Sequence, residues 1–600
     1  MHTLAGIISP GYILPPEQSA KRMFDAMSHP PAVRPGFSHF DQSGVQVGWL
    51  TSAQTTPASA PGWSDSRRVA VIFVGEEFSA EKSSGASTTA AAMLANNYER
   101  FGAQTLLDLN GWFSGVIIDL RDYSTVLFND RYGRGRVYFH RTSIGFFFAS
   151  EAKALLGVLP QLRELDQRAL AEWFAVGCVL QDRSLFRDIE LLPPGSIWIF
   201  KRDGRIARQR YFDPGAWEQQ SPLSTGGYIE QLREIFSRIA PRYARGAAPV
   251  AMSLTGGLDS RAVLAWSGAA EGALPCYTFA GPYRDCADVV IARRLAEIRR
   301  HAHTTIRIGP DFFRQFSTLA ARTVHLSDGT MDVSGAVELH VNELARDIAP
   351  VRLTGNYGSE ILRSHLAFRP ARLDRSLFTP EFAGLLDTAE DTYRSESSGH
   401  RLSFIAFKQV PWHHHGRFAV EKSQLTPRSP FLDNELVALA YRAPSHLATS
   451  AQPLLDLIAG GDPQLAAIDT DRGLAQRSRP VVSRIARAWH EFTAKAEYAA
   501  DYGMPRWLAC ASRPFAKLNW ERLFLGRHKF YHFRLWYRHQ LAESVRAQAA
   551  ADTGGVESCY RAGASQRLVA EHLSGRANRT LDLHRLLSIR LINRHLLRAS

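Results

Sequence analysis

The stretch Ser253-Leu254-Thr255-Gly256-Gly257-Leu258-Asp259-Ser260 is the segment of the chain that decides the fold. An apolar run at 250–252 precedes it and predicts a buried strand, and residues 261–266 follow it with helical character. A strand, a Gly-Gly turn and a helix start together form an anion site, because glycine lets the backbone approach a ligand and the first helical N–H groups have no intrahelical partner. No Gly-Lys-Ser/Thr follows, so this is not a Walker loop. A purely structural turn is the alternative for the loop taken alone.

Side chains within the loop suit a polyphosphate that carries a divalent cation. Thr255 and Ser260 offer hydroxyl donors, and Asp259 can hold the cation against the phosphates. The loop resembles the pyrophosphate loop of ATP pyrophosphatases, enzymes that activate a carboxylate as its AMP ester. This resemblance implies ATP and Mg2+ as cofactors. The residues implied to bind the nucleotide are Ser253, Thr255, Gly256, Gly257, Leu258, Asp259 and Ser260.

Length and composition indicate a globular protein of several domains. The chain has 600 residues, 45% of them hydrophobic and 22% charged, which is too long for one core and ordinary in composition. No apolar run approaches the ~18–20 residues of a membrane helix, and the start lacks the pattern of a secretory signal. The five cysteines are dispersed, which favours neither a disulfide framework nor a zinc site. We therefore expect a cytoplasmic protein without membrane insertion.

The chain carries a formal net charge of +13, and much of the excess is arginine after residue 470. Such charge can attract nucleic acid, an acidic substrate or a membrane surface. The arginines are spread among apolar positions, which favours a solvated basic face, so we expect no nucleic-acid partner.

Two patterns divide the chain into an α/β arrangement. Residues 1–212 are mostly β, because short runs rich in β-branched and aromatic residues are bounded by Gly, Asp or Asn. Strands alternate with helices over 225–480, which predicts a doubly wound parallel sheet with ligands beyond the carboxyl ends of its strands. Residues 481–600 form a basic helical extension in this interpretation. The strands expected in the first part are 68–74, 111–119, 125–129, 137–140, 144–149 and 196–200.

Further segments occur in the order known from class B asparagine synthetases. They are 107–115, 129–133, 148–155, 192–196, 353–360 and 430–433. From about residue 5 to 475 the chain therefore resembles the asparagine synthetase and β-lactam synthetase superfamily. The resemblance implies an Ntn-hydrolase-like αββα domain followed by an ATP-pyrophosphatase domain.

The glutaminase half departs from the family. The family's cysteine nucleophile corresponds to Ala5, and the Asn of its Asn-Gly-Glu motif, which serves the oxyanion hole, corresponds to Val74. Hydrolysis of an amide needs both a nucleophile and a preorganised donor. We therefore expect a degenerate domain without glutaminase activity.

The second active-site loop departs as well. The family's catalytic Glu and metal-binding Asp align with Asn356 and Ser359, which leaves Glu360 as the carboxylate and metal ligand beside Asp259. Gly355 of this loop belongs to the implied nucleotide site.

Two further positions complete the predicted site. Asp288 opens a helix where the family often has an acidic residue near the nucleotide, and a helix N-cap is the alternative. The family's catalytic lysine should fall near 468–473, where Arg472 is the nearest cation; arginine stabilises charge but is no base. The predicted catalytic residues are Asp259, Glu360 and Arg472, and the predicted metal ligands are Asp259 and Glu360.

The remaining features predict an ATP-dependent ligase that forms an acyl-AMP and passes the acyl group to an amine. Without a glutaminase the amine comes from solution or from the substrate itself, and an intramolecular attack removes much of the entropic barrier. The chain looks most like a lasso-peptide cyclase, which closes a macrolactam between an N-terminal amine and an acidic side chain. That resemblance implies a linear core or precursor peptide as substrate, with a leader peptidase and a leader-binding protein as partners. A β-lactam-forming or ammonia-dependent amidotransferase and a nucleotide-binding pseudoenzyme scaffold are the alternatives.

Overall fold

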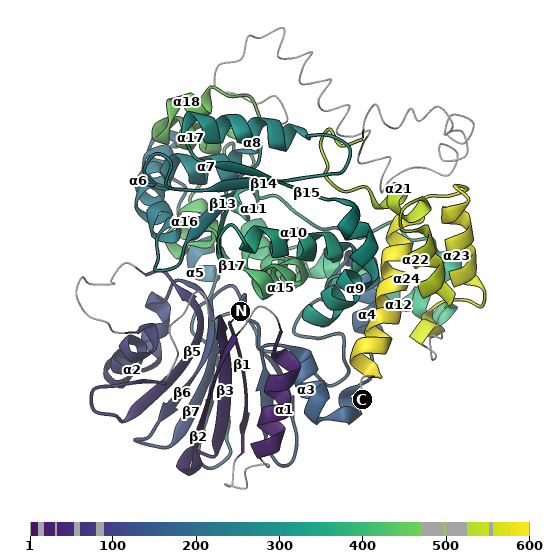
Figure 1. Ribbon diagram of the computed structural model, residues 1–600. Helices are drawn as coiled ribbons and strands as arrows, with labels where there is room; N and C mark the ends of the chain where they lie inside the picture. The colour runs from purple at the N-terminus through teal and green to yellow at the C-terminus, as the bar shows by residue number, and fades with distance from the viewer. Residues whose placement is uncertain are drawn as a thin grey trace.

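The computed structural model describes residues 2–9, 17–29, 33–52, 61–79, 89–470, 497, 525–550 and 556–598. Figure 1 shows a lower β-sandwich, an upper parallel sheet wrapped by helices, and a C-terminal helical group at one side. The start of the chain lies between the lower and upper parts. Within the described ranges, no helix is both long and apolar enough to cross a bilayer.

Two antiparallel sheets form the β-sandwich. In spatial order, the first contains β10 (Glu190–Leu191), β8 (Tyr138–Arg141), β9 (Phe146–Ala149), β1 (His2–Ile8), β3 (Val45–Ser52) and β2 (Val33–Phe40). The second contains β12 (Ile206–Arg210), β11 (Ser196–Phe200), β7 (Ser124–Asn129), β6 (Gly111–Asp119), β5 (Val69–Glu77) and β4 (Gly62–Trp63). Helices α1 (Glu17–Met27) and α3 (Ala152–Val158) pack on the first sheet, and α2 (Ala90–Phe101) packs on the second. The predicted αββα arrangement is confirmed.

Alternation along the strands builds the core of the sandwich. Leu4 and Val47 of the first sheet meet Ile72 and Val116 of the second, and each is at most 2% exposed. Successive residues of a strand point to opposite faces, so Ile7 packs away from this core, on the α1 and α3 side. The sequence pattern predicts no strand within residues 2–52. A proline and a glycine inside β2 weaken the strand signal there, and pairing with β3 along its full length overrides it.

The upper part contains a parallel sheet in the order β15 (His303–Arg307), β14 (Cys276–Ala280), β13 (Val250–Ser253), β16 (Val351–Thr354) and β17 (Thr426–Arg428). All four strand pairs are parallel, which confirms the predicted doubly wound sheet. The helices around it include α6 (Thr225–Ala244), α7 (Leu258–Trp266), α8 (Ala287–Ile298), α9 (Pro310–Leu326), α10 (Ala336–Arg346), α11 (Gly358–Leu362), α15 (His415–Gln424) and α17 (Gln452–Gly461).

The order of the strands indicates where a ligand would bind. β14 and β15 extend the sheet on one side of β13, whereas β16 and β17 extend it on the other. The chain therefore reverses its direction of winding between β13 and β16. Open α/β sheets bind ligands at such a switch point, outside the carboxyl ends of the strands. The Gly-Gly loop that follows β13 lies at this point.

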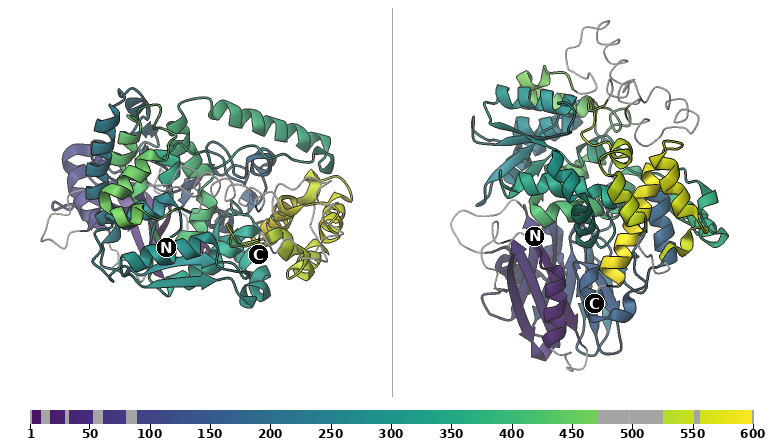
Figure 2. Two further views of the ribbon diagram at one scale, coloured as in Figure 1. Left: turned by 90° about the horizontal axis from the view of Figure 1, so that it is seen from above. Right: turned by 45° about the vertical axis from the view of Figure 1, so that its right-hand side comes forward.

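Helices near the C-terminus cover one flank of the molecule (Figure 2). They are α21 (Phe533–Arg538), α22 (Ala542–Ala550), α23 (Ala564–Leu573) and α24 (Thr580–Ile592). They pack beside α9, and α4 (Gln167–Val176) and α12 (Pro380–Glu396) lie next to them. Trp536 of α21 is fully buried against Phe312 and Phe313 of α9, so this aromatic residue belongs to the core.

Polar residues of the sequence motifs join the sandwich to the parallel-sheet part. Asn110 donates to the Asp433 carboxylate at 2.6 Å and accepts from the Asn434 backbone at 3.0 Å. Glu76 accepts from the Arg428 guanidinium at the end of β17, with Nε at 2.8 Å. These charge-assisted bonds are buried or nearly so, which fixes the register between the two parts.

A buried ionic cluster forms a second junction. Lys153 of α3 lies 2.5 Å from Glu151 and 3.3 Å from Asp328, which follows α9, and these side chains are at most 6% exposed. Asp328 also accepts from the backbone N–H groups of Ala152 and Lys153. Although burial opposes the charge, the two carboxylates raise the pKa of Lys153 above its ordinary value.

Replacing Lys153 by methionine leaves two buried carboxylates without their cation. We expect a loss of about 3–5 kcal/mol of stability, measured by chemical denaturation. The matched control is Lys201→Met, which removes an ion pair with Asp122 whose side chains are 44% and 49% exposed. That change should cost roughly 0–1 kcal/mol. Equal effects of the two substitutions would contradict the role of the cluster.

Candidate active site

Two loops touch at the carboxyl ends of β13 and β16. A Cβ added to Gly355 would lie 2.3 Å from the Ser260 nitrogen, and one added to Gly358 would lie 2.7 Å from the Asp259 Cβ. Real Cβ atoms do not approach this closely, so both positions require glycine. The backbone after β16 is therefore pressed against the first turn of α7.

Side chains hold the loop after β13 in shape. The Ser260 hydroxyl accepts from the Thr255 N–H at 3.1 Å and lies 2.9 Å from the Thr255 hydroxyl. Asp288 in the first turn of α8 accepts from the Gly256 N–H at 2.8 Å. The N-cap of α8 is Cys286, so Asp288 supports the loop and does not cap its helix.

Arg261 was not identified from the sequence, although it ties the loop to a distant segment. Its side chain is 1% exposed and donates to the carbonyl oxygens of Gly256 at 3.1 Å and Asp469 at 3.3 Å. The chain just before 471 therefore passes beside the loop. The predicted cation Arg472 lies outside the described residues.

Asp259 and Glu360 provide the acidic end of the site. Ser359, which aligns with the family's metal-binding Asp, donates to the Asp259 carboxylate from its N–H at 3.0 Å and from its hydroxyl at 2.8 Å. Burial, with a further contribution from the Asp259 charge, raises the pKa of Glu360 to about 7. No group of three or more His, Cys, Asp or Glu residues suited to a metal occurs in the described ranges. The carboxylates of Asp259 and Glu360, which line one cavity, nevertheless fit Mg2+, which usually takes one or two carboxylates and completes its shell with phosphates and water.

A cavity of about 360 Å³ opens between the two loops and α15. It is lined by Ser253, Thr255, Asp259, Ser260, Phe279, Arg352, Thr354, Gly355, Asn356, Tyr357, Ser359, Glu360, His414, Arg417, Phe418, Glu421 and Phe530. Six of the predicted site residues are therefore in one cavity wall: Ser253, Thr255, Asp259, Ser260, Gly355 and Glu360. Gly256, Gly257, Leu258 and Asp288 lie in or against the loop behind this wall.

Two matches with domain families fall on this architecture. Residues 71–212 match the glutamine amidotransferase domain, and residues 231–417 match asparagine synthase. The chain is therefore similar to a glutamine amidotransferase domain over its first segment and to asparagine synthase over its second. The second match covers both loops and ends on α15, so it contains most of the cavity wall.

Two named proteins are similar to the chain over part of their length. The chain is 24% identical over 303 residues to a glutamine-hydrolyzing asparagine synthetase 2, named as putative, of Methanocaldococcus jannaschii, covering 48% of this chain and 56% of that protein. It is 20% identical over 362 residues to glutamine-hydrolyzing asparagine synthetase 1 of Bacillus subtilis, covering 59% and 56%. The chain thus spans just over half the length of these relatives. Among solved structures, the PRPP amidotransferase of B. subtilis, complexed with ADP and GMP, matches 52% of this chain and 91% of its own at 11% identity and a TM-score of 0.27.

Ala5 and Val74, on which the expectation of a domain without glutaminase activity rests, are both buried in the sandwich. Ala5 lies in the middle of β1, is fully buried, and pairs with Gly48 of β3 and Ala149 of β9. Val74 is 3% exposed. An alanine and a valine side chain offer neither a nucleophile nor a hydrogen-bond donor.

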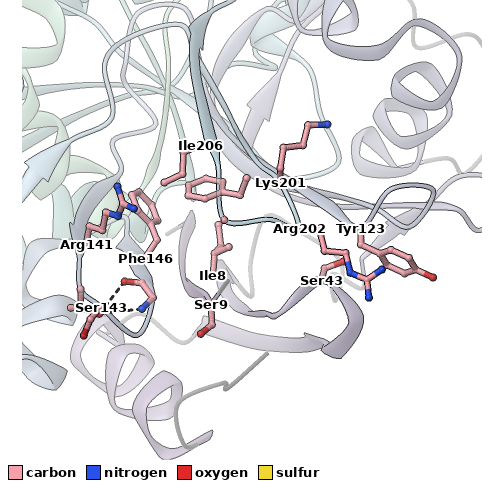
Figure 3. Close-up of a pocket in the computed structure, with 14 residues that line it drawn as sticks. Ile8, Ser9, Ser43, Tyr123, Arg141, Ser143, Phe146, Lys201, Arg202 and Ile206 are labelled. Atoms are coloured by element: carbon pink, nitrogen blue, oxygen red, sulfur yellow. Dashed lines mark hydrogen bonds between the residues drawn. The ribbon is translucent and has the colours of Figure 1, made fainter. Parts of the chain in front are cut away.

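A separate cavity of about 160 Å³ lies at the far end of the sandwich (Figure 3). Its floor is apolar, with Ile8, Phe146 and Ile206, and Arg141 and Arg202 lie at its edge. Ile8 ends β1, whose start faces the parallel-sheet half (Figure 1), so this cavity is remote from the two loops. None of the predicted site residues lines it.

The C-terminal part contributes a residue that sequence analysis missed. Phe530 lines the cavity with its ring 5.7 Å from that of Phe279, and its carbonyl oxygen would be 2.6 Å from a Cβ on Gly281. Lys529, directly before it, is 3% exposed and lies over the Tyr531 ring at 5.0 Å. Phe530 and Lys529 lie far along the sequence from 468–473, which is why the spacing alone did not reveal them.

The His413-His414-His415 segment leads into α15, which begins at His415, and packs inside the protein. His413 stacks on Phe368 at 4.8 Å, and His415 is 5% exposed. His414 lines the cavity 3.7 Å from Glu360. Burial lowers the pKa of all three imidazoles, so each is neutral near pH 7.

Substituting Gly355 by alanine should separate the two loops. We expect ATP with Mg2+ to raise the thermal midpoint of the wild type but not of Gly355→Ala, measured by differential scanning fluorimetry. Gly309→Ala is the control, because nothing lies within 4 Å of a Cβ there. A nucleotide-induced shift retained in Gly355→Ala would show that contact between the loops is not required.

Proposed function

We propose that the protein is an ATP-dependent ligase that activates a carboxylate as its acyl-AMP and joins the acyl group to an amine. The observation that carries this proposal is the pair of interlocked loops, in which Ser359 fixes Asp259 and both Asp259 and Glu360 line one cavity. Asp259 and Glu360 would hold Mg2+, which neutralises the phosphates of ATP. The domain matches support ligase chemistry, and the relatives support it by their names.

The proposed reaction has two steps, and the loop at 255–260 acts in the first. The substrate carboxylate oxygen attacks the α-phosphorus of ATP, and pyrophosphate leaves into the loop at 255–260. The amine nitrogen then attacks the acyl carbon, the bond to AMP breaks, and the amine proton passes to solvent or to a base. The loop N–H groups and hydroxyls stabilise the departing charge by position alone.

The amine is proposed to belong to the same substrate. Ala5 leaves the sandwich without a nucleophile, so no glutamine-derived ammonia is produced at that position. An N-terminal amine and an acidic side chain of one peptide would close a macrolactam, as in the lasso-peptide cyclases that the sequence resembles. The substrate would then be a linear core or precursor peptide, with a leader peptidase and a leader-binding protein as partners.

A pseudoenzyme is favoured by one observation, the replacement of both second-loop functional residues by Asn356 and Ser359. Incubation with ATP, Mg2+ and candidate peptides separates the two. We expect pyrophosphate release and a peptide lighter by one water, detected by mass spectrometry, and loss of both in Asp259→Asn. A folded wild type that releases no pyrophosphate would support the scaffold instead.

We further propose that Lys529, and not Arg472, supplies the catalytic cation that the sequence resemblance implies. Lys529 directly precedes Phe530 of the cavity wall. Lys529→Met should lower the rate of pyrophosphate release by about 100-fold or more, since a positive charge next to the cavity wall is lost. Lys201→Met, at an exposed ion pair, should leave the rate unchanged. An unchanged rate in Lys529→Met would return the assignment to Arg472.

A further inference from the structure

One face of α15 forms a wall of the cavity. His414, Arg417, Phe418 and Glu421 all line it, and their spacing of three, four and seven residues places them along one side of a helix. Phe279 and Phe530 extend the apolar part of this wall. The acidic residues Asp259 and Glu360 lie on the two loops, so the cavity has an acidic loop side and a mixed aromatic and basic helix side.

The two arginines of the cavity wall differ in how they are held. Arg352 is 4% exposed, and its terminal nitrogens bond Glu421 at 2.9 Å, Asn342 at 3.1 Å and Ser253 at 3.0 Å. Its guanidinium is therefore committed to the sheet and to α15. This arginine positions Glu421 and the end of β13, and it presents little surface to a ligand.

Arg417 forms an ion pair with Glu338 and is otherwise partly exposed. One terminal nitrogen lies 2.9 Å from Glu338 of α10, whose side chain is 10% exposed, whereas the Arg417 side chain is 48% exposed. The Glu338 carboxylate raises the pKa of Arg417 above its ordinary range, so the guanidinium stays charged. Arg417 lines the cavity together with Tyr357 and Glu360 of the second loop.

We propose that Arg417 binds the carboxylate of the acyl substrate and presents it to the second loop. Arginine has donors along two edges, so an edge held by Glu338 leaves others for a carboxylate in planar geometry. The loop after β13 brings its own N–H and hydroxyl donors for phosphate, whereas Arg417 brings the donor set for a second anion. Phe418 and Phe530 would pack against the methylene groups that carry that carboxylate. The inference rests on the proposed ligase function and names its substrate as a side-chain carboxylate on an aliphatic stem.

Binding of a defined probe tests the assignment without turnover. The full-length protein is saturated with Mg2+ and the non-cleavable analogue AMP-CPP, and N-acetyl-glutamate α-amide is titrated by calorimetry. The neutral counterpart, N-acetyl-glutamine amide, should bind more weakly to the wild type. Arg417→Gln should weaken binding of the acidic probe by about 10–100-fold, and Arg417→Lys by less. Affinity for AMP-CPP should stay the same.

Arg346→Gln is the matched control. Arg346 of α10 bonds Gln424 of α15 at 2.5 Å, so it joins the same two helices, yet it does not line the cavity. Loss of AMP-CPP affinity in Arg417→Gln would assign the residue to phosphate, and failure of the wild type to bind the acidic probe would overturn the inference. Unchanged probe binding in Arg417→Gln would do the same. Probe binding through Arg417 with no pyrophosphate release would instead refute the ligase function alone.

Discussion

The contact between the two loops at the switch point is the constraint on which the site depends. Gly355 and Gly358 have no room for a Cβ against the first turn of α7, so the loop after β16 is fixed relative to the loop after β13. Ser359 then bonds Asp259, and Glu360 follows one residue later on the same side. The positions of both acidic residues are thus set by backbone contact, which is more rigid than contact between long side chains.

The backbone conformation of Tyr357 decides which side chains of the second loop face the cavity. Tyr357 has a left-handed backbone, with φ of 73°, which costs a residue with a side chain of order 1 kcal/mol or more. It is held there by burial and by Arg134, whose guanidinium lies 5.2 Å from its ring centre. Tyr357, and not Asn356, therefore presents a large side chain to the cavity, and the Asn356 carbonyl accepts from Ser429.

Sequence reasoning located the features that depend on local chemistry. The Gly-Gly loop, the alternation of strands and helices and the absent nucleophile at Ala5 are all local patterns. It did not locate Arg261, Arg417 or Phe530, because their roles arise only when α7, α15 and the C-terminal part converge. The burial of the histidines at the start of α15 was not predictable for the same reason: the pattern carries no sign that Phe368 and Glu360 lie beside them.

The sandwich supports the wall of the cavity in the other half of the molecule. Arg134 lies 4.3 Å from the Phe418 ring centre, and Trp112 meets Phe418 edge to face at 5.4 Å. Both residues belong to the sandwich, whereas Phe418 belongs to the wall of the cavity in the other half. Removing the sandwich would expose the back of α15 and free the helix to shift. The packing face of the sandwich therefore contributes to the shape of the cavity.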